Sequence, residues 1–298
     1  GRGDPGACAG RDRGVSLPPP GDGAWTREGL QGYGLHVGPI WCDANGPLAL
    51  RIEERHTNIT GRVHGGMAMG LASMGLARAA QGAARAARPG SRATLLNLNV
   101  ELIDSAQVGD WLFTEAIVQR TTRTMVFVAG GLRSGERTVL TASAVYQIEA
   151  EASPSRLRAS ETMALHPDHS VREPVDAFSA HVGTFHVRAD AQGEPIGGLQ
   201  VLPDCLDARG GDEIDAGMVL MMADLFLGRR ARTLSGSVCV TVGMGISRLA
   251  PVRLGDALEV ESHTEGQHGE TLVVSGRFRV NSLPVFSATS LWKMVEKK

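Results

Sequence analysis

The residues best suited to chemistry lie directly ahead of an apolar stretch rich in Ala, Met and Leu. Asn58 and His64 precede Gly65 and Gly66, and residues 67–74 have the composition of a buried helix. The first N–H groups of a helix have no partner within it and lie at the positive end of its dipole. Glycine lets a ligand carbonyl come close to such N–H groups. The sequence therefore predicts a helix terminus that can hold a developing oxyanion.

A second copy of this pattern lies 151 residues later, which indicates an internal repeat. Residues 215–218 (Asp-Ala-Gly-Met) match residues 64–67 (His-Gly-Gly-Met). The apolar positions of both copies recur on one face of a helix and are expected in the core. They are Met67, Leu71 and Met74 in the first copy, and Met218, Met222 and Leu225 in the second.

Farther along, the two copies stay aligned with a smaller offset. Residues 255–256 (Gly-Asp) follow residues 109–110 by 146 positions, and residues 271–273 follow 124–126 by 147. The drop from 151 to 146 predicts five extra residues in the first copy, between positions 81 and 90.

Each copy is expected to contain one long helix followed by antiparallel strands. The helices are predicted at about 64–88 and about 215–231. Alternating apolar and polar residues predict half-buried strands. Their ranges are 96–102, 112–120, 125–132, 139–148, 238–246, 258–264, 272–280 and 286–294. A long helix and an antiparallel sheet in each copy make the fold class α+β.

The chain is predicted to divide into four parts. Residues 1–24, rich in Gly, Pro and Arg, form a disordered tail. Residues 25–150 form the first domain, the polar segment 151–174 is a linker, and residues 175–298 form the second domain. Small residues on the first helix, Gly66, Gly70, Ala72 and Gly75, are expected to let strands pack closely against it.

Composition argues against several classes of partner. With 30 basic and 32 acidic residues, the chain has no net field that favours nucleic acid or a membrane. No apolar run reaches the roughly 18 residues of a membrane span, and no apolar signal segment is visible, so a cytoplasmic protein is expected. The four cysteines, Cys8, Cys42, Cys205 and Cys239, have no metal-type spacing, and no metal is expected.

The pattern Asn-x-x-Gly-x-x-His-Gly-Gly at residues 58–66, ahead of a buried helix, resembles the hotdog-fold acyl-CoA thioesterases of the phenylacetate-degradation and hydroxybenzoyl-CoA type. The resemblance covers roughly residues 30–150 and 175–298. It implies two tandem hotdog domains, each a long helix wrapped by an antiparallel sheet, that form an internal pseudo-dimer. It also implies hydrolysis of an acyl-CoA thioester without a separate cofactor, since coenzyme A is part of the substrate. Two such chains could associate as a homodimer.

In this family the helix terminus and a helix carboxylate come from different domains. Position 73 lies about two and a half turns after position 64, on the opposite side of the helix, so a carboxylate there would serve a neighbouring helix. The first copy has Ser73 at this position, whereas the second has Asp224. Asp215 replaces the histidine in the second copy. One complete site and one broken site are therefore expected.

The complete site is predicted to combine Asn58, His64 and Gly65 with Asp224 and Thr241. The family often carries a hydroxyl on the strand after the helix. The 146-residue offset places it at Thr241, opposite Leu95 in the first copy, and the 151-residue offset places Arg209 opposite Asn58.

Each predicted residue would have its own part in the reaction. The Gly65 N–H would hold the oxyanion, and Asn58 would position the carbonyl or a water. Asp224 would be a general base or a nucleophile, and both roles stay open. Thr241 would orient the water or the intermediate. His64 would stabilise the departing thiolate or shape the loop.

Substrate binding is expected to involve Gly66 and basic residues near strand ends. Arg123 and Arg248 are the candidates for the phosphates of coenzyme A, together with Arg120 and Arg253.

Structural alternatives exist for most of these residues. Asn58 could cap a turn, His64 and the glycines could serve packing, and Thr241 is a usual strand residue. A structural role is also open for Asp224 but is the least favoured there, because Asp224 interrupts an apolar helix where an unpaired carboxylate is costly. At the level of function, the alternatives are a non-catalytic acyl-CoA-binding or regulatory module and a hydratase or dehydratase on the same fold.

Overall fold

A computed structural model describes residues 18–21, 23–44, 46–150 and 164–295. The predictions for most of the tail (1–17 and 22) and for the first part of the linker (151–163) lie outside the described residues. No helix in the described ranges is both long enough and apolar enough to cross a membrane.

Each half of the chain contains one long helix and a set of strands. The first half contains β1 Thr26–Arg27, α1 Gly34–Val37, β2 Trp41–Cys42, β3 Leu48–Arg51, a 3-10 helix Glu54–His56, α2 Gly65–Ala87, β4 Ser91–Leu102, β5 Trp111–Thr121, β6 Met125–Ser134 and β7 Arg137–Ala150. The second half contains β8 Ser170–Val171, α3 Ala177–His181, β9 His186–Ala189, β10 Pro195–Gln200, a 3-10 helix Pro203–Cys205, α4 Ala216–Ser235, β11 Val238–Arg248, β12 Ala257–His268, β13 Thr271–Val280 and β14 Leu283–Val295.

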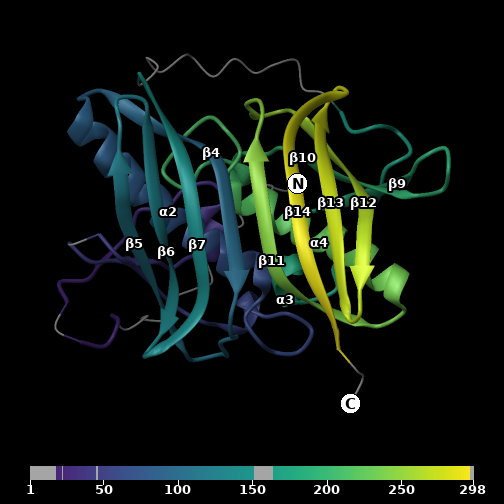
Figure 1. Cartoon of the computed structure of the whole chain (residues 1–298), viewed down its shortest axis with the longest axis horizontal. Helices are drawn as coiled ribbons and strands as arrows, with labels where there is room; N and C mark the ends of the chain where they lie inside the picture. The colour runs from purple at the N-terminus through teal and green to yellow at the C-terminus, as the bar shows by residue number, and fades with distance from the viewer. Residues whose placement is uncertain (1–17, 22, 45, 151–163, 296–298) are drawn as a thin grey trace, which may run out of the picture.

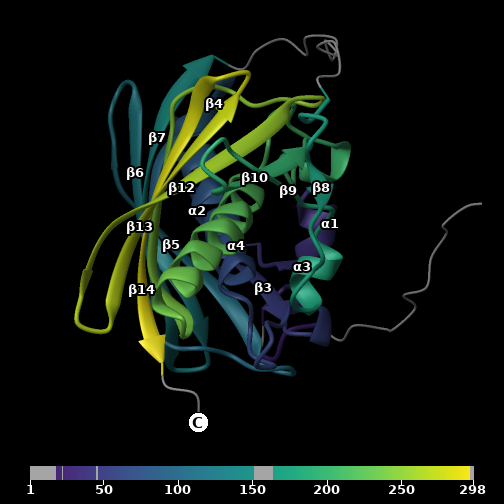
Figure 2. The same cartoon turned by 90° about the vertical axis from the view of Figure 1, so that its right-hand side faces the viewer.

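The described strands form one 14-stranded sheet in the order β1-β2-β3-β5-β6-β7-β4-β11-β14-β13-β12-β10-β9-β8. The antiparallel pair β4 and β11 joins the two halves at its centre (Figure 1). The sheet curves around α2 and α4, which lie against its inner face, and α1 and α3 lie beyond these helices (Figure 2). The fold is α+β, as predicted, with the same helix-and-sheet unit in each half.

Sheet irregularities repeat at corresponding positions and confirm the internal repeat. The pairing of β4 with β7 shifts between Leu95 and Asn97, and that of β11 with β14 shifts between Thr241 and Gly243, 146 residues later. The predicted offset of 147 for β6 and β13 is wrong by one residue, because the two strands keep the 146-residue register and begin at Met125 and Thr271.

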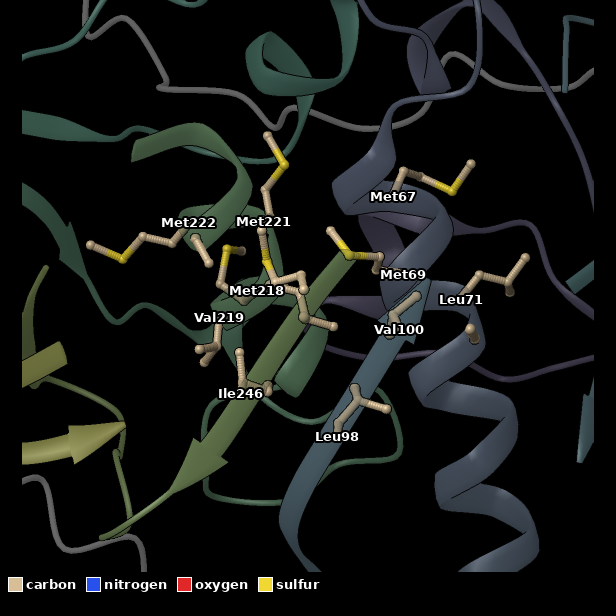
Figure 3. Close-up of a cluster of buried hydrophobic side chains, with 14 of the residues drawn as sticks. Met67, Met69, Leu71, Leu98, Val100, Met218, Val219, Met221, Met222 and Ile246 are labelled. Atoms are coloured by element: carbon tan, nitrogen blue, oxygen red, sulfur yellow. The ribbon is translucent and has the colours of Figure 1, made fainter. Parts of the chain in front are cut away.

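The core lies between the helices and the centre of the sheet. Figure 3 shows Met67 and Leu71 of α2, Met218 and Met222 of α4, and strand residues such as Ile246 in one cluster, and all five are at most 1% exposed. The predicted core positions are therefore confirmed, apart from Met74, which is only partly buried. Burial of these side chains from both halves stabilises the joined structure, since each large apolar side chain contributes about 1.5–3 kcal/mol.

Two predicted boundaries need correction, one at the end of a helix and one in the linker. α4 continues to Ser235 rather than stopping near residue 231, and Gly236, with a φ of 63°, ends it in the left-handed conformation that glycine adopts easily. Within the predicted linker, β8 pairs with β9, so ordered structure of the second half begins earlier than expected.

The small residues of α2 serve several kinds of contact, not only contacts with strands. A Cβ added at Gly75 would lie 2.7 Å from Thr114 of β5, as the prediction requires. At Gly66 it would instead lie 2.9 Å from Met221 of α4, and at Gly70 it would lie 2.5 Å from the Tyr33 hydroxyl. Of these three glycines, only Gly66 lets the two halves pack closely, whereas Gly70 makes room for Tyr33 of the same half and Gly75 makes room for the sheet.

Candidate active site

The N-terminus of α2 is organised by His64, which is its N-cap residue. His64 Nδ1 accepts a hydrogen bond of 3.0 Å from the Gly66 N–H. Gly65 is the first residue of α2, where the helix itself supplies no acceptor for the backbone N–H. A Cβ added at Gly65 would lie 3.5 Å from Asp224 Oδ1 and 3.5 Å from Leu102 Cδ2. The missing side chain therefore leaves a small space between the helix terminus and the carboxylate.

Asp224 of α4 faces this helix terminus, as the complementary halves predict. Its Oδ2 lies 3.6 Å from His64 Nδ1, and its side chain is 10% exposed. Its Oδ1 accepts a hydrogen bond of 2.7 Å from Thr241 Oγ1. The fold therefore brings Gly65, His64, Asp224 and Thr241 together from two halves of the chain.

A β-bulge turns Thr241 toward Asp224. Strict alternation predicts one buried face for Val240 and Met244, but Val240 is 45% exposed and Met244 only 3%. The register shift between Thr241 and Gly243 adds one residue to β11, so the residues before it present the opposite set of side chains to the core. The predicted strand is correct, and the predicted face of its first residues is wrong.

Asn58 lies in a turn ahead of His64. Its Oδ1 accepts hydrogen bonds of 2.9 Å from the Thr60 N–H and 2.7 Å from Thr60 Oγ1. Gly61, with a φ of 73°, completes this turn. These bonds are those of the turn-capping alternative, and among the described residues Asn58 makes no hydrogen bond with His64, Asp224 or Thr241.

The predicted match of Arg209 with Asn58 is wrong. In the second half Asp207 occupies the corresponding turn position, because its Oδ1 accepts from the Arg209 N–H and its carbonyl accepts from the Gly210 N–H. The backbone bond that closes the turn runs from Asp207 to Glu213, whereas it runs from Asn58 to Arg62 in the first half. The longer turn shifts the alignment.

Asp176 is a site residue that sequence reasoning missed. It is the N-cap of α3, and its Oδ2 lies 3.4 Å from His64 Nε2, with both side chains 6% exposed. In the structure a capping box with Ser179 fixes the helix start, but Asp-x-x-Ser is not the usual capping-box sequence, and nothing local predicts the contact with His64.

The charges around His64 set its titration. Burial lowers the pKa of His64, but contact with Asp176 and the charges of Asp224 and Asp176 outweigh burial, so the pKa is raised overall. For Asp176, burial raises the pKa, yet the attraction of His64 and the Ser179 N–H lower it overall. The Asp176 carboxylate thus favours protonation of His64, and His64 favours the ionised form of Asp176.

The predicted phosphate-binding arginines lie in different surroundings. Arg248 is already paired with Glu213 at 2.6 Å, and Arg253 lies 3.6 Å from Asp212. Arg120 and Arg123 are exposed at the end of the β5–β6 hairpin. In the described part of the chain, none of these four arginines forms a hydrogen bond or an ion pair with Gly65, His64, Asp224 or Thr241.

The N-terminus of α4, the counterpart of the α2 terminus, is covered by other side chains of the protein. Asp215 is its N-cap, and the position equivalent to Gly65 is Ala216. A Cβ added at Gly217 would overlap the Tyr33 ring, so this ring covers the terminus. Burial first, and then the charge of Asp207, raise the pKa of Asp215 to about 7. These features agree with the prediction that the second copy of the site is broken.

Asp215→Asn is expected to alter the pH dependence of stability. The folded protein binds a proton at Asp215 more tightly than the unfolded chain, so wild-type stability from this group falls as pH rises from about 4 to about 7. Asparagine does not titrate. The free energy of unfolding is measured in urea at pH 4.5 and at pH 8. Between these two pH values, the variant should become more stable relative to the wild type by more than about 1 kcal/mol. The same difference in unfolding free energy between the two proteins at pH 4.5 and at pH 8 would contradict this prediction.

Comparison with known proteins identifies the family. The model of the thioesterase superfamily matches residues 60–141. A Pseudomonas aeruginosa protein named "Putative esterase PA0474" is 37% identical over 116 residues, which are 38% of this chain and 84% of that protein. The chain belongs to the thioesterase superfamily.

Solved structures agree on the fold. The tesB protein of Mycobacterium avium subsp. paratuberculosis has a TM-score of 0.64 at 11% identity, covering 88% of this chain and 98% of that one. A hot dog fold protein from Alicyclobacillus acidocaldarius has a TM-score of 0.62 at 17% identity, covering 88% and 97%. The architecture is thus that of two hotdog units in one chain.

Proposed function

We propose that the protein hydrolyses an acyl-CoA thioester at one composite site between its two halves. The observation that carries the proposal is the space between the Gly65 terminus of α2 and the Asp224 carboxylate, which a single methyl group would fill. A thioester carbonyl at the helix terminus would place its carbon within reach of a water held by Asp224.

The chemistry follows from the positions of the groups. The Gly65 N–H would hold the oxygen that becomes negative, and one such donor contributes about 3–4 kcal/mol to the transition state. Thr241 holds one oxygen of Asp224, which fixes the orientation of the carboxylate. Asn58 would act indirectly, by shaping the turn that leads to His64. Gly66 would contribute by keeping α2 close to α4.

Of the two roles left open for Asp224, we favour the general base. One carboxylate oxygen is bound by Thr241 and the other faces His64, so the group is better placed to take a proton than to form a new bond to carbon. Hydroxylamine added during turnover should leave Asp224 unmodified. A hydroxamate formed on the Asp224 side chain would show that an anhydride had formed there and that Asp224 is the nucleophile.

Coenzyme A as the leaving group is supported by a set of arginines near α3 and α4. Arg172 lies over the Phe226 ring at 5.8 Å. Burial first, then the charges of Arg229 and Arg232, lower its pKa. Among the described residues, no carboxylate makes an ion pair with these three arginines. Three neighbouring guanidinium groups without a carboxylate ion pair favour an anionic ligand such as a phosphate. We propose them for this role ahead of Arg123 and the already paired Arg248.

The function is tested by incubating the purified protein with a panel of acyl-CoAs and a thiol reagent. The panel includes aliphatic acyl-CoAs, phenylacetyl-CoA and hydroxybenzoyl-CoA, the last two because of the family subtype that the sequence resembles. Release of the thiol is the expected result. Saturable binding without release would favour a binding module, and hydration of an enoyl-CoA would favour a hydratase.

A further inference from the structure

His64 is enclosed by acidic groups supplied by the other half of the chain. Asp176 of α3 lies 3.4 Å from Nε2, and Asp224 of α4 lies 3.6 Å from Nδ1. The Phe178 ring packs on the imidazole with centroids 5.5 Å apart, which keeps the ring in place. A histidine held on both sides by carboxylates is suited to gaining and losing a proton.

The hydrogen bonds define the resting tautomer. Because Nδ1 accepts from the Gly66 N–H, this nitrogen carries no proton, and the ring proton lies on Nε2, toward Asp176. A proton added at Nδ1 would end the bond from Gly66 and create a donor beside Asp224. The Gly66 N–H would then be free to join the Gly65 N–H at the oxyanion.

We propose that Asp176 is a positioning residue that holds His64 ready to accept a proton from Asp224 and deliver it to the departing thiolate. The proposal rests on the hydrolysis proposed above. It also explains why Asp176 and Asp224 come from the same half, opposite the half that supplies His64.

The proposed steps balance. Water forms a bond to the thioester carbon, Asp224 takes its proton, and the carbonyl electrons move to oxygen. The proton passes from Asp224 to His64 Nδ1. When the oxyanion collapses, the carbon–sulfur bond breaks with its electrons on sulfur, and Nδ1–H protonates the thiolate. His64 returns to its resting tautomer, and the products are a carboxylic acid and a thiol.

The electrostatics around His64 agree with this assignment. Asp176 and Asp224 favour the imidazolium, whereas burial and the charge of Arg232 oppose it. In well-characterised catalytic triads, a buried carboxylate of this kind orients the histidine and stabilises its cationic form.

Asp176→Asn is the informative variant, because asparagine caps a helix as well as aspartate but carries no charge. With acyl-CoA, kcat is expected to fall at least about tenfold, since the imidazolium loses its partner. With an aryl thioester, whose thiolate needs no proton to leave, the loss should be much smaller. The rising limb of the kcat/KM profile should move to lower pH, because the His64 pKa falls without the carboxylate.

Ser179→Ala is the matched control. It removes the bonds that the Val175 and Asp176 N–H groups donate to Ser179 Oγ, and it keeps the bond from the Ser179 N–H to the Asp176 carboxylate. A loss of stability with the wild-type leaving-group preference and pH profile is expected. If Ser179→Ala reproduces the Asp176→Asn kinetics, Asp176 serves only to hold α3, and the proposal is overturned.

The wild type supplies a second measurement that needs no variant. Proton delivery predicts that its kcat depends weakly on the basicity of the leaving thiol. A steep dependence overturns the proposal even if Asp176→Asn does not fold. Full activity of Asp176→Asn with both substrates overturns it while the proposed hydrolysis stands. A wild type inert toward every thioester overturns both.

Discussion

Asp224→Asn is expected to lower kcat for thioester hydrolysis at least about a hundredfold, because no carboxylate remains to take the proton from water. The amide has the shape of the carboxylate, and its oxygen can still accept the 2.7 Å bond from Thr241. Folding should therefore be retained, and loss of a charge that is only 10% exposed should not lower the melting temperature. Thiol release and thermal unfolding measure the two effects separately.

Ser73→Ala is the control for this variant. Ser73 occupies the corresponding position of α2, is 4% exposed and belongs to the incomplete copy of the site. Its replacement should leave the rate of thiol release unchanged. A wild-type rate for Asp224→Asn, or an equal loss in both variants, would remove Asp224 from the mechanism.

Gly65→Ala is expected to reduce kcat/KM about a hundredfold or more without loss of stability. The added methyl would make ordinary contacts of 3.5 Å, and alanine is the better helix former, so the fold should tolerate it. It would nevertheless occupy the space where the thioester carbonyl must meet the Gly65 N–H. Removing one such donor typically costs about 10²–10³ in rate.

Two comparisons make this result specific. Gly66→Ala would place its methyl 3.1 Å from Met221 Cα, so stability and activity should fall together. Ala216→Gly makes the reverse change at the incomplete site and should leave activity as it is, because Tyr33 still covers that terminus. Wild-type kinetics for Gly65→Ala would show that the reaction takes place elsewhere.

Much of the fold could be predicted from the sequence because the same pattern of helix and strands occurs twice in the chain. The match of residues 64–67 with 215–218 identified the two helices, and the 146-residue offset identified the strands. Errors arose where one copy has a local difference. The longer turn after Asp207 displaced the match of Asn58, and helix α4 extends beyond its apolar stretch to Gly236.

The sequence by itself determined which groups the site would contain. A histidine ahead of two glycines, and a carboxylate in an apolar helix where the other copy has serine, are local features. Together with the family resemblance, in which the helix terminus and the helix carboxylate come from different domains, they predicted that Asp224 would face Gly65. Helix periodicity agrees, because it places position 73 on the opposite side of the helix from position 64.

Only the tertiary structure decided how these groups are held. A bulge in β11 turns Thr241 inward, and the packing of α3 brings Asp176 to His64. Glu213 binds Arg248, which the sequence had assigned to substrate. Each of these depends on contacts between segments far apart in the chain. Such contacts are set by how the whole sheet pairs and how the helices pack, and no local spacing of residues encodes them.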